Sequence, residues 1–212
     1  MLDFILGTGL LPDTVIRSGI RRLLKQRIKE TETNFCLDRF ITQLNTTPKI
    51  ALSTETSKDQ HYEVPTEFYQ HVLGPKLKYS SGYWLNDQDT LHESEDQMLD
   101  MYCERAQLQD GQHILDLGCG WGSLTLFLAK KYPNSQITGL SHSITQRHYI
   151  LSEAKQQNLT NISVITCDIN SVEISATFDR ILSIELFEHM RNYNQLFERV
   201  SQWLVKDGLL FL

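Results

Sequence analysis

The sequence has 212 residues, of which 41% are hydrophobic and 22% are charged. This composition excludes a disordered or fibrous chain and predicts one globular domain with a sizeable core and a small appendage. The formal net charge of -6 at pH 7 argues against a general affinity for nucleic-acid phosphates. The four cysteines form no C-x-x-C pair and no metal-ligand spacing with histidine, so we expect no metal site and a reduced, cytoplasmic protein.

The N-terminal segment is basic and has the pattern of an amphipathic helix. Residues 1–30 contain six Lys or Arg and three Asp or Glu, and apolar side chains recur at helical spacing from residue 12 to residue 30. Such a helix either packs on its own domain or makes a weak contact with an anionic membrane surface, and we favour packing. The apolar run over residues 4–11 is too short to span a membrane and lacks the charge order of a secretory signal.

The next segments predict a boundary between two parts of the chain. A second helical pattern covers residues 34–44, and the polar, Ser/Thr-rich residues 46–60 have no periodicity and predict a linker. We therefore expect an N-terminal helical segment with its linker at residues 1–60 and a larger domain at residues 61–212.

Two helices are expected at the start of the larger domain. Pro65 and the Gly74-Pro75 pair predict the beginning and the end of a short helix. Thr90 and Glu93 have the spacing of a capping box, which predicts a longer helix that ends before Asp110.

From residue 113 onward, short apolar runs alternate with amphipathic helices. This alternation predicts an α/β fold with a doubly wound, mostly parallel sheet that helices cover on both faces. Ligands bind to such sheets at the carboxyl ends of the strands, so the loops that follow strands are candidate sites. The expected strands are 114–117, 136–140, 162–166, 180–184 and 208–212, and the expected helices are 123–131, 144–157 and 192–205.

The strongest motif is the string from His113 to Gly122, which runs from a strand through three glycines into a helix. Glycines let the backbone approach a ligand closely, and enzymes that bind nicotinamide dinucleotides use a related G-x-G-x-x-G turn. Asp116 stands just before the glycines, where its carboxylate attracts a ligand ammonium and repels a pyrophosphate. S-adenosylmethionine carries an ammonium and no phosphate, so the string favours this molecule as the cofactor.

Five strings of the chain resemble the cyclopropane fatty acid synthase and coclaurine N-methyltransferase group of class I S-adenosylmethionine-dependent methyltransferases. The fit to the plant N-methyltransferases is closer than the fit to the cyclopropane synthases. The resemblance runs from about His61 to Leu212 and implies a Rossmann-like core preceded by helices. The strings are residues 61–69, 78–84, 116–122, 143–146 and 183–190.

The resemblance also implies which residues bind the cofactor. Tyr79 and Ser80 match residues that close over its methionine end, and Gln146 matches a ribose contact that is also at a helix-capping position. His142 stands where the plant enzymes usually have Asn. The carboxylate of Asp168 suits the adenine amino group, with the amide of Ile169 as a donor, and the alternative for Asp168 is a helix or turn cap. The full set of expected cofactor contacts is Tyr79, Ser80, Asp116, Gly118, Gly120, His142, Gln146, Asp168 and Ile169.

The candidate catalytic residues are Glu185, Glu188 and His189, which follow the fourth expected strand. If this segment turns helically, the i, i+3 and i+4 spacing brings two carboxylates and an imidazole together. An ammonium substrate must lose a proton before it accepts a methyl group, so we expect His189 or Glu188 to act as the general base. The alternative is a solvated, acidic start of a helix.

These residues predict a methyltransferase that N-methylates a small amine. Cyclopropane synthases typically have glycine at the position of Glu185, and the added negative charge favours an amine over a lipid alkene. Two alternatives stay open: a cyclopropane-fatty-acyl-phospholipid synthase-like methyl transfer to a lipid alkene, and a non-catalytic remnant that binds the cofactor. The resemblance implies seven strands and the sequence predicts five, so we expect a C-terminally truncated fold with an unpaired apolar edge.

Overall fold

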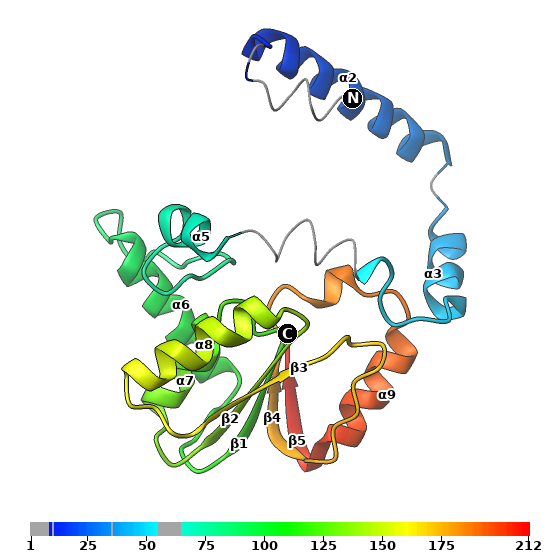
Figure 1. Ribbon diagram of the computed structural model, residues 1–212. Coiled ribbons are helices and arrows are strands. Elements are labelled where there is room, and N and C mark those ends of the chain that lie inside the picture. Colours follow the sequence, from blue (N-terminus) through cyan, green and yellow to red (C-terminus); the bar gives the residue numbers. More distant parts are fainter. Residues whose placement is uncertain (1–8, 10, 35, 55–64) are drawn as a thin grey trace. The chain divides into compact units, whose positions relative to one another are not determined.

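The computed structural model describes residues 9, 11–34, 36–54 and 65–212. Their contacts divide the chain into two compact units, Met1–Thr46 and Thr47–Leu212. The described part of the first unit contains α2 (Asp13–Asn34) and α3 (Leu37–Thr46), which correspond to the two helical patterns of the sequence (Figure 1).

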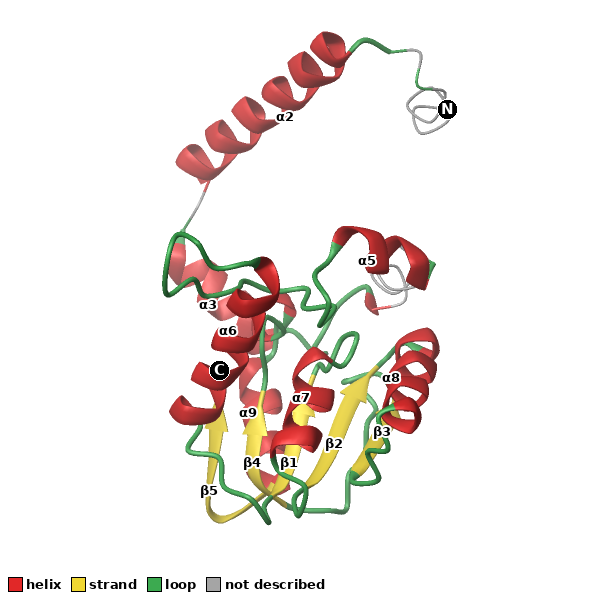
Figure 2. Ribbon diagram, turned by 90° about the vertical axis from the view of Figure 1, so that its left-hand side faces the viewer, coloured by secondary structure: helices red, strands yellow, loops and turns green. Residues whose placement is uncertain are grey.

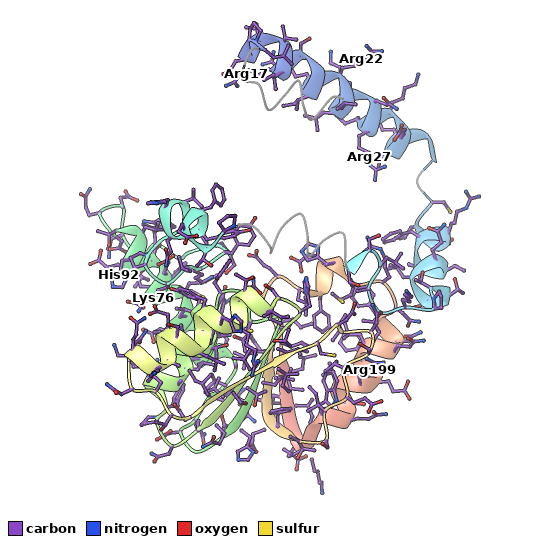
Figure 3. All side chains as sticks on the ribbon, viewed as in Figure 1. Arg17, Arg22, Arg27, Lys76, His92 and Arg199 are labelled. Atoms are coloured by element: carbon purple, nitrogen blue, oxygen red, sulfur yellow. The ribbon has the colours of Figure 1, made fainter. Side chains whose placement is uncertain are left out.

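Most of the described side chains of α2 are exposed. Basic residues such as Arg17, Arg22 and Arg27 project from the helix (Figure 3), and its apolar residues Leu23 and Leu24 are also more than half exposed. Contacts inside this unit therefore do not bury the apolar face of the helix. None of the helices described is both long and apolar enough to cross a membrane.

The second unit is built on a five-stranded sheet in the order β3-β2-β1-β4-β5, in which every neighbouring pair is parallel (Figure 2). This confirms the predicted α/β, doubly wound sheet. The final strand begins earlier than the sequence predicts. The strands are β1 (His113–Leu117), β2 (Gln136–Ser141), β3 (Ile162–Thr166), β4 (Phe178–Leu182) and β5 (Leu204–Phe211).

Helices cover both faces of the sheet. Figures 1 and 2 show α6, α7 and α8 on one face and α9 on the other. Thr90 and Glu93 form the predicted capping box at the start of α6, with each side chain bonded to the other residue's backbone N–H. The helices of this unit are α5 (Thr66–Val72), α6 (Leu91–Arg105), α7 (Ser123–Lys131), α8 (Ile144–Gln156) and α9 (Tyr193–Trp203).

The side chains of β1 point alternately into the two halves of the core, one on each face of the sheet. Ile114 packs with the residues of α6 and α7, whereas Leu115 and Leu117 pack with those of α9. Because successive strand residues point to opposite faces, Asp116 lies on the α7 side of the sheet, at the carboxyl end of the strand. Here its side chain bonds to Thr125 of α7.

Two residues of the segment 47–54, Ile50 and Ala51, belong to the core of the second unit. Ile50 is 1% exposed and Ala51 is 4% exposed, and both pack in the cluster that contains Met190. Ala51 also forms an antiparallel bridge with Met190, and the Arg191 N–H donates to the carbonyl of Ile50. The prediction of a linker over residues 46–60 is therefore wrong for its first part, while residues 55–64 lie outside the described residues.

Candidate active site

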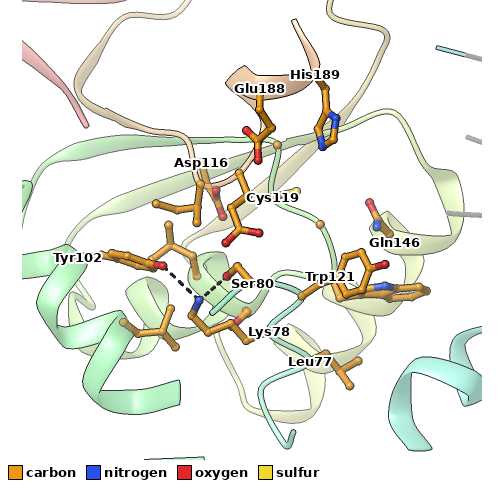
Figure 4. Close-up of a pocket in the computed structure, with 18 residues that line it drawn as sticks. Leu77, Lys78, Ser80, Tyr102, Asp116, Cys119, Trp121, Gln146, Glu188 and His189 are labelled. Atoms are coloured by element: carbon orange, nitrogen blue, oxygen red, sulfur yellow. Dashed lines mark hydrogen bonds between the residues drawn. The ribbon is translucent and has the colours of Figure 1, made fainter. Parts of the chain in front are cut away.

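A cleft opens beside the glycine loop, at the carboxyl ends of β1 and β4 (Figure 4). It brings together residues from five separate segments of the chain. Those that the sequence predicted are Tyr79, Ser80, Asp116, Gly118, Gly120, Gln146, Glu185, Glu188 and His189. Those that it did not single out for chemistry include Lys78, Tyr102 and Ser123.

The glycine loop forms one wall of this cleft. The N–H groups of Gly118 and Cys119 both donate to the carbonyl of Leu140 on β2, which holds the loop against the sheet. Gly118 and Gly120 have positive φ angles of 91° and 51°, a region that residues with a side chain rarely adopt. A Cβ atom on Gly120 would meet no protein atom within 4 Å, so the backbone there is open to a ligand.

Asp116 is a buried carboxylate at the base of the cleft. Its side chain accepts a hydrogen bond of 2.7 Å from the Thr125 hydroxyl, and burial raises its pKa to about 6. The described residues give it no salt bridge. A buried charge without a counter-charge is unfavourable, so a cationic group of a ligand would stabilise the ionised form.

Glu185, Glu188 and His189 line the same cleft, but they do not share one helical turn. The 3₁₀ helix η2 covers only Phe187–His189, and Glu185 has a φ of 53° in the left-handed region. The predicted helical spacing is therefore wrong for Glu185. The chain departs from a helix here because the side chain of Leu186 lies against Gly118, and the Ser81 N–H donates to Glu185 Oε1 at 3.4 Å.

The backbone of Glu185 is strained, since a left-handed conformation costs a residue with a Cβ on the order of 1 kcal/mol. Such strain is retained most often where a side chain has a function. Here the conformation turns the chain so that Glu185 lines the cleft together with Glu188 and His189.

A second cleft adjoins the first, and the two share Gly118 and His189 in their linings. Its lining is mostly apolar. Two of the predicted cofactor contacts, His142 and Ile169, lie in it. The other lining residues are Ala51, Leu52, Thr54, Leu117, Leu140, Ser141, Cys167, Leu186 and Met190.

Asp168 lines neither cleft, although the sequence predicts it as an adenine contact. One carboxylate oxygen accepts from the Thr54 hydroxyl at 2.5 Å and the other accepts from the Asn170 N–H at 2.7 Å. The carboxylate therefore caps a turn and ties the segment before residue 55 to the loop after β3. This is the second use that the sequence allows for an aspartate at this position.

Gln146 forms only part of the capping box that the sequence suggested for its segment. Its backbone N–H donates to the hydroxyl of Ser143, which caps α8. Its side chain does not return to the backbone of Ser143 as in a full capping box, because its Oε1 accepts from the hydroxyl of Ser141 at 2.6 Å. The amide group is buried and lines the first cleft.

Lys78 and Ser123 are functional candidates that the sequence did not reveal. Lys78 opens one of the resembling strings, yet a lysine beside a tyrosine and a serine is typical of a solvated loop. Ser123 follows the glycine loop, and its buried hydroxyl has no hydrogen-bond partner among the described residues. A serine at the first position of a helix is ordinary in sequence, so its position in the cleft shows only in the structure.

Comparison with known proteins places this site in a family. A model of the mycolic acid cyclopropane synthetase family matches residues 51–212. The (S)-coclaurine N-methyltransferase of Thalictrum flavum subsp. glaucum is 43% identical over 98% of this chain and 59% of its own length. The cyclopropane-fatty-acyl-phospholipid synthase of Escherichia coli strain K12 is 32% identical over 72% of this chain and 39% of its own.

A crystal structure of a coclaurine N-methyltransferase, bound to N-methylheliamine and S-adenosylhomocysteine (SAH), is also similar. It has 45% sequence identity and a TM-score of 0.84, over 95% of this chain and 60% of that one. The chain thus spans about three fifths of the length of these N-methyltransferases. The family match and the relatives confirm the resemblance found in the sequence, and the chain belongs to the mycolic acid cyclopropane synthetase family.

Proposed function

We propose that this chain binds S-adenosylmethionine and transfers its methyl group to the nitrogen of a small amine. The observation that carries the proposal is the convergence of Glu185, Glu188 and His189 on a cleft that also contains the glycine loop and Asp116. The similarity to a structure that holds an N-methylated amine and SAH supports it.

The two adjoining clefts suit the two ends of the cofactor. S-adenosylmethionine has a flat adenine ring at one end and an amino acid with an ammonium and a carboxylate at the other. The apolar second cleft suits the adenine, with Ile169 and His142 in its lining. The first cleft supplies Asp116 for the ammonium, and the hydroxyls of Ser80 and Ser123 as hydrogen-bond donors. When bound, the cofactor supplies an electrophilic methyl group on a sulfonium.

The acidic residues of the first cleft would act on the amine. Glu185 and Glu188 would hold a cationic amine by charge, close to the glycine loop. His189 Nε2 or Nδ1, or a carboxylate oxygen of Glu188, would accept the ammonium proton and so expose the lone pair of the nitrogen. After transfer, this group would release the proton to water, because Glu188 and His189 are both exposed.

Two observations favour an amine over a lipid alkene as the acceptor. Besides Asp116, which we assign to the cofactor, two carboxylates line the first cleft, at Glu185 and Glu188, and they suit a cationic acceptor better than a neutral chain. The chain is also more similar to the (S)-coclaurine N-methyltransferase, at 43% identity, than to the cyclopropane-fatty-acyl-phospholipid synthase, at 32%.

An assay of the purified chain with isotope-labelled S-adenosylmethionine tests the proposal. A panel of small cyclic amines and vesicles of unsaturated phospholipid are incubated separately, and the products are analysed by mass spectrometry. We expect labelled N-methyl products in the amine panel. Label in the lipid alone would support methyl transfer to an alkene and overturn the amine proposal. Binding of SAH by calorimetry without product in either assay would support a non-catalytic protein.

We also propose a cytoplasmic location for the chain. All four cysteines, Cys36, Cys103, Cys119 and Cys167, are free thiols, and Cys36 is exposed. Free thiols persist in a reducing compartment, which supports the proposal.

Asn170→Ala is expected to weaken SAH binding by about three- to tenfold. The Asn170 side chain accepts from the Ala51 N–H and donates to the Ala51 carbonyl, both at 3.0 Å. It therefore fixes Ala51 and Leu52 as one wall of the second cleft. Calorimetric titration with SAH measures the effect.

Gln156→Ala is the matched control for this prediction, because Gln156 is an exposed amide on α8 outside both clefts. It should bind SAH as the unmodified chain does. If Asn170→Ala folds and binds SAH with unchanged affinity, the wall formed by residue 51 does not contribute to the adenosine site.

A further inference from the structure

Lys78 is the one lysine or arginine that is buried in the described part of the chain, with 5% of its surface exposed. It lines the first cleft, whose other charged lining residues are Asp116, Glu185, Glu188 and the titratable His189. Burying an ammonium costs free energy unless the group is hydrogen-bonded or paired with an opposite charge, so we expect such partners around Lys78.

The contacts of Lys78 use all three donors of its ammonium. Nζ donates to the hydroxyl of Tyr102 at 3.2 Å and to the hydroxyl of Ser80 (Figure 4). It also donates to the carbonyl of Ser81 at 2.7 Å. Tyr102 lies on α6, so the lysine fastens the loop of residues 78–81 to that helix. The loop holds the two residues expected at the methionine end of the cofactor, Tyr79 and Ser80.

Ser81 connects the lysine to the acidic side of the cleft. Its carbonyl accepts from Lys78, and its N–H donates to Glu185 Oε1 at 3.4 Å. The backbone of Ser81 thus links the Lys78 ammonium to the Glu185 carboxylate. Glu185 and Glu95 are the acids that favour the charged lysine, against burial.

We propose that Lys78 is a positioning residue of the methyl-transfer site, which holds the Ser80 hydroxyl in the cleft and whose positive charge opposes the binding of the amine in its protonated form. This inference rests on the proposed function and deepens it. An amine without its proton has the lone pair that methyl transfer needs. The carboxylates attract the amine. The positive charge of Lys78 repels the protonated amine and so lowers the free-energy cost of removing the proton from the amine in the cleft.

The charge on Lys78 can be varied by pH as well as by mutation. Burial lowers its pKa to about 8. It is therefore mostly protonated at pH 7 and mostly neutral at pH 9. Glu185 and Glu95 are the acids that act on its charge. The titratable residues that line the cleft with it are Tyr79, Tyr102, Asp116, Cys119, Glu185, Glu188 and His189.

Lys78→Met tests the proposal through binding, without turnover. The SAH complex is titrated with a quaternary cyclic ammonium and with its neutral carbon isostere. In Lys78→Met we expect the ammonium to bind about three- to tenfold tighter than in the unmodified chain, with no change for the isostere. SAH itself should bind more weakly, because the Ser80 hydroxyl loses its anchor.

Two variants control the interpretation. Lys78→Arg keeps a positive charge that does not titrate below pH 12, and should keep the low affinity for the ammonium at both pH 7 and pH 9. Lys76→Met removes a lysine two positions away that pairs with Asp96 and lies outside the cleft lining. It should behave as the unmodified chain in every titration.

The unmodified chain provides a second measurement that needs no variant to fold. Between pH 7 and pH 9 the affinity of the unmodified chain for the quaternary ammonium should rise by about three- to tenfold, as expected for Lys78→Met. The affinity of Lys78→Arg should not change over this range. An unchanged ratio of ammonium to isostere affinity in Lys78→Met, or across this pH range, overturns the role of Lys78. SAH binding without N-methylation of any amine would instead overturn the proposed function, and the affinity ratios would still decide the role of the lysine.

Discussion

Glu188→Gln is expected to lower kcat for N-methylation by about 10² or more while leaving SAH affinity unchanged. Glu188 lies in η2 beside His189, and its exposed carboxylate lines the first cleft. Glutamine has the same shape but neither holds a cation by charge nor accepts the ammonium proton. Turnover is measured from labelled methyl groups by mass spectrometry, and SAH affinity by calorimetry.

Glu198→Gln is the matched control, because Glu198 is an exposed acid on α9 outside the cleft lining. It should leave both kcat and SAH affinity unchanged. An unaltered rate in Glu188→Gln would remove this carboxylate from the mechanism and leave His189 as the candidate base. A parallel loss of SAH affinity would instead assign Glu188 to cofactor binding.

The order of strands and helices was predictable because its causes are local. Apolar runs of four or five residues, a capping box at Thr90 and a glycine loop before Ser123 each act over a few positions. Helix α7 accordingly has its predicted bounds of 123–131. Asp116 was predictable for the same reason, since its position follows from the strand that ends at Leu117 and the glycines that come next.

The features that the sequence did not show depend on contacts between distant residues. Ala51 packs in the core, where Asn170 bonds to its backbone from 119 positions away. Lys78 is buried because Tyr102, one helix later, provides a hydroxyl for its ammonium. Periodicity contains no information of this kind, and a polar segment such as 46–60 resembles a linker whether or not part of it packs.

Glu185 shows a different limit of sequence patterns. The i, i+3 and i+4 spacing from Glu185 to His189 predicts one helical face, and the three side chains do line one cleft. The backbone that carries them is not one helical turn, because Glu185 is in the left-handed region and a short 3₁₀ helix follows it. In this conformation Leu186 packs against Gly118, and that contact joins two loops 68 positions apart in the sequence.

Buried Asp116 links cofactor binding to the stability of the fold. Its pKa is about 6 in the folded chain, against 3.8 for an unburied aspartate. The folded chain thus holds the proton more tightly than the unfolded chain does. Proton binding by Asp116 therefore adds to the free energy of unfolding. This addition is fully present below about pH 4 and is lost as the pH rises through about 6. At neutral pH the site therefore contains a buried negative charge that destabilises the chain without ligand.

Asp116→Asn is expected to lower SAH affinity by about 10²-fold, because the ligand ammonium loses its buried counter-charge. The same change should raise the free energy of unfolding at pH 7 by about 1–3 kcal/mol without ligand, since asparagine keeps the bond from Thr125 and carries no charge. Calorimetry with SAH, and urea unfolding at pH 4 to 8, measure the two effects.

Asp87→Asn, at an exposed position outside the clefts, is the control and should change neither SAH affinity nor the dependence of stability on pH. A more stable Asp116→Asn chain that binds SAH poorly would show that burial of this carboxylate favours ligand binding at the expense of the unliganded fold. Since both effects depend on the same desolvated charge, they should appear together. An Asp116→Asn chain that keeps full SAH affinity would separate the carboxylate from the ligand ammonium and contradict the interpretation of the glycine motif.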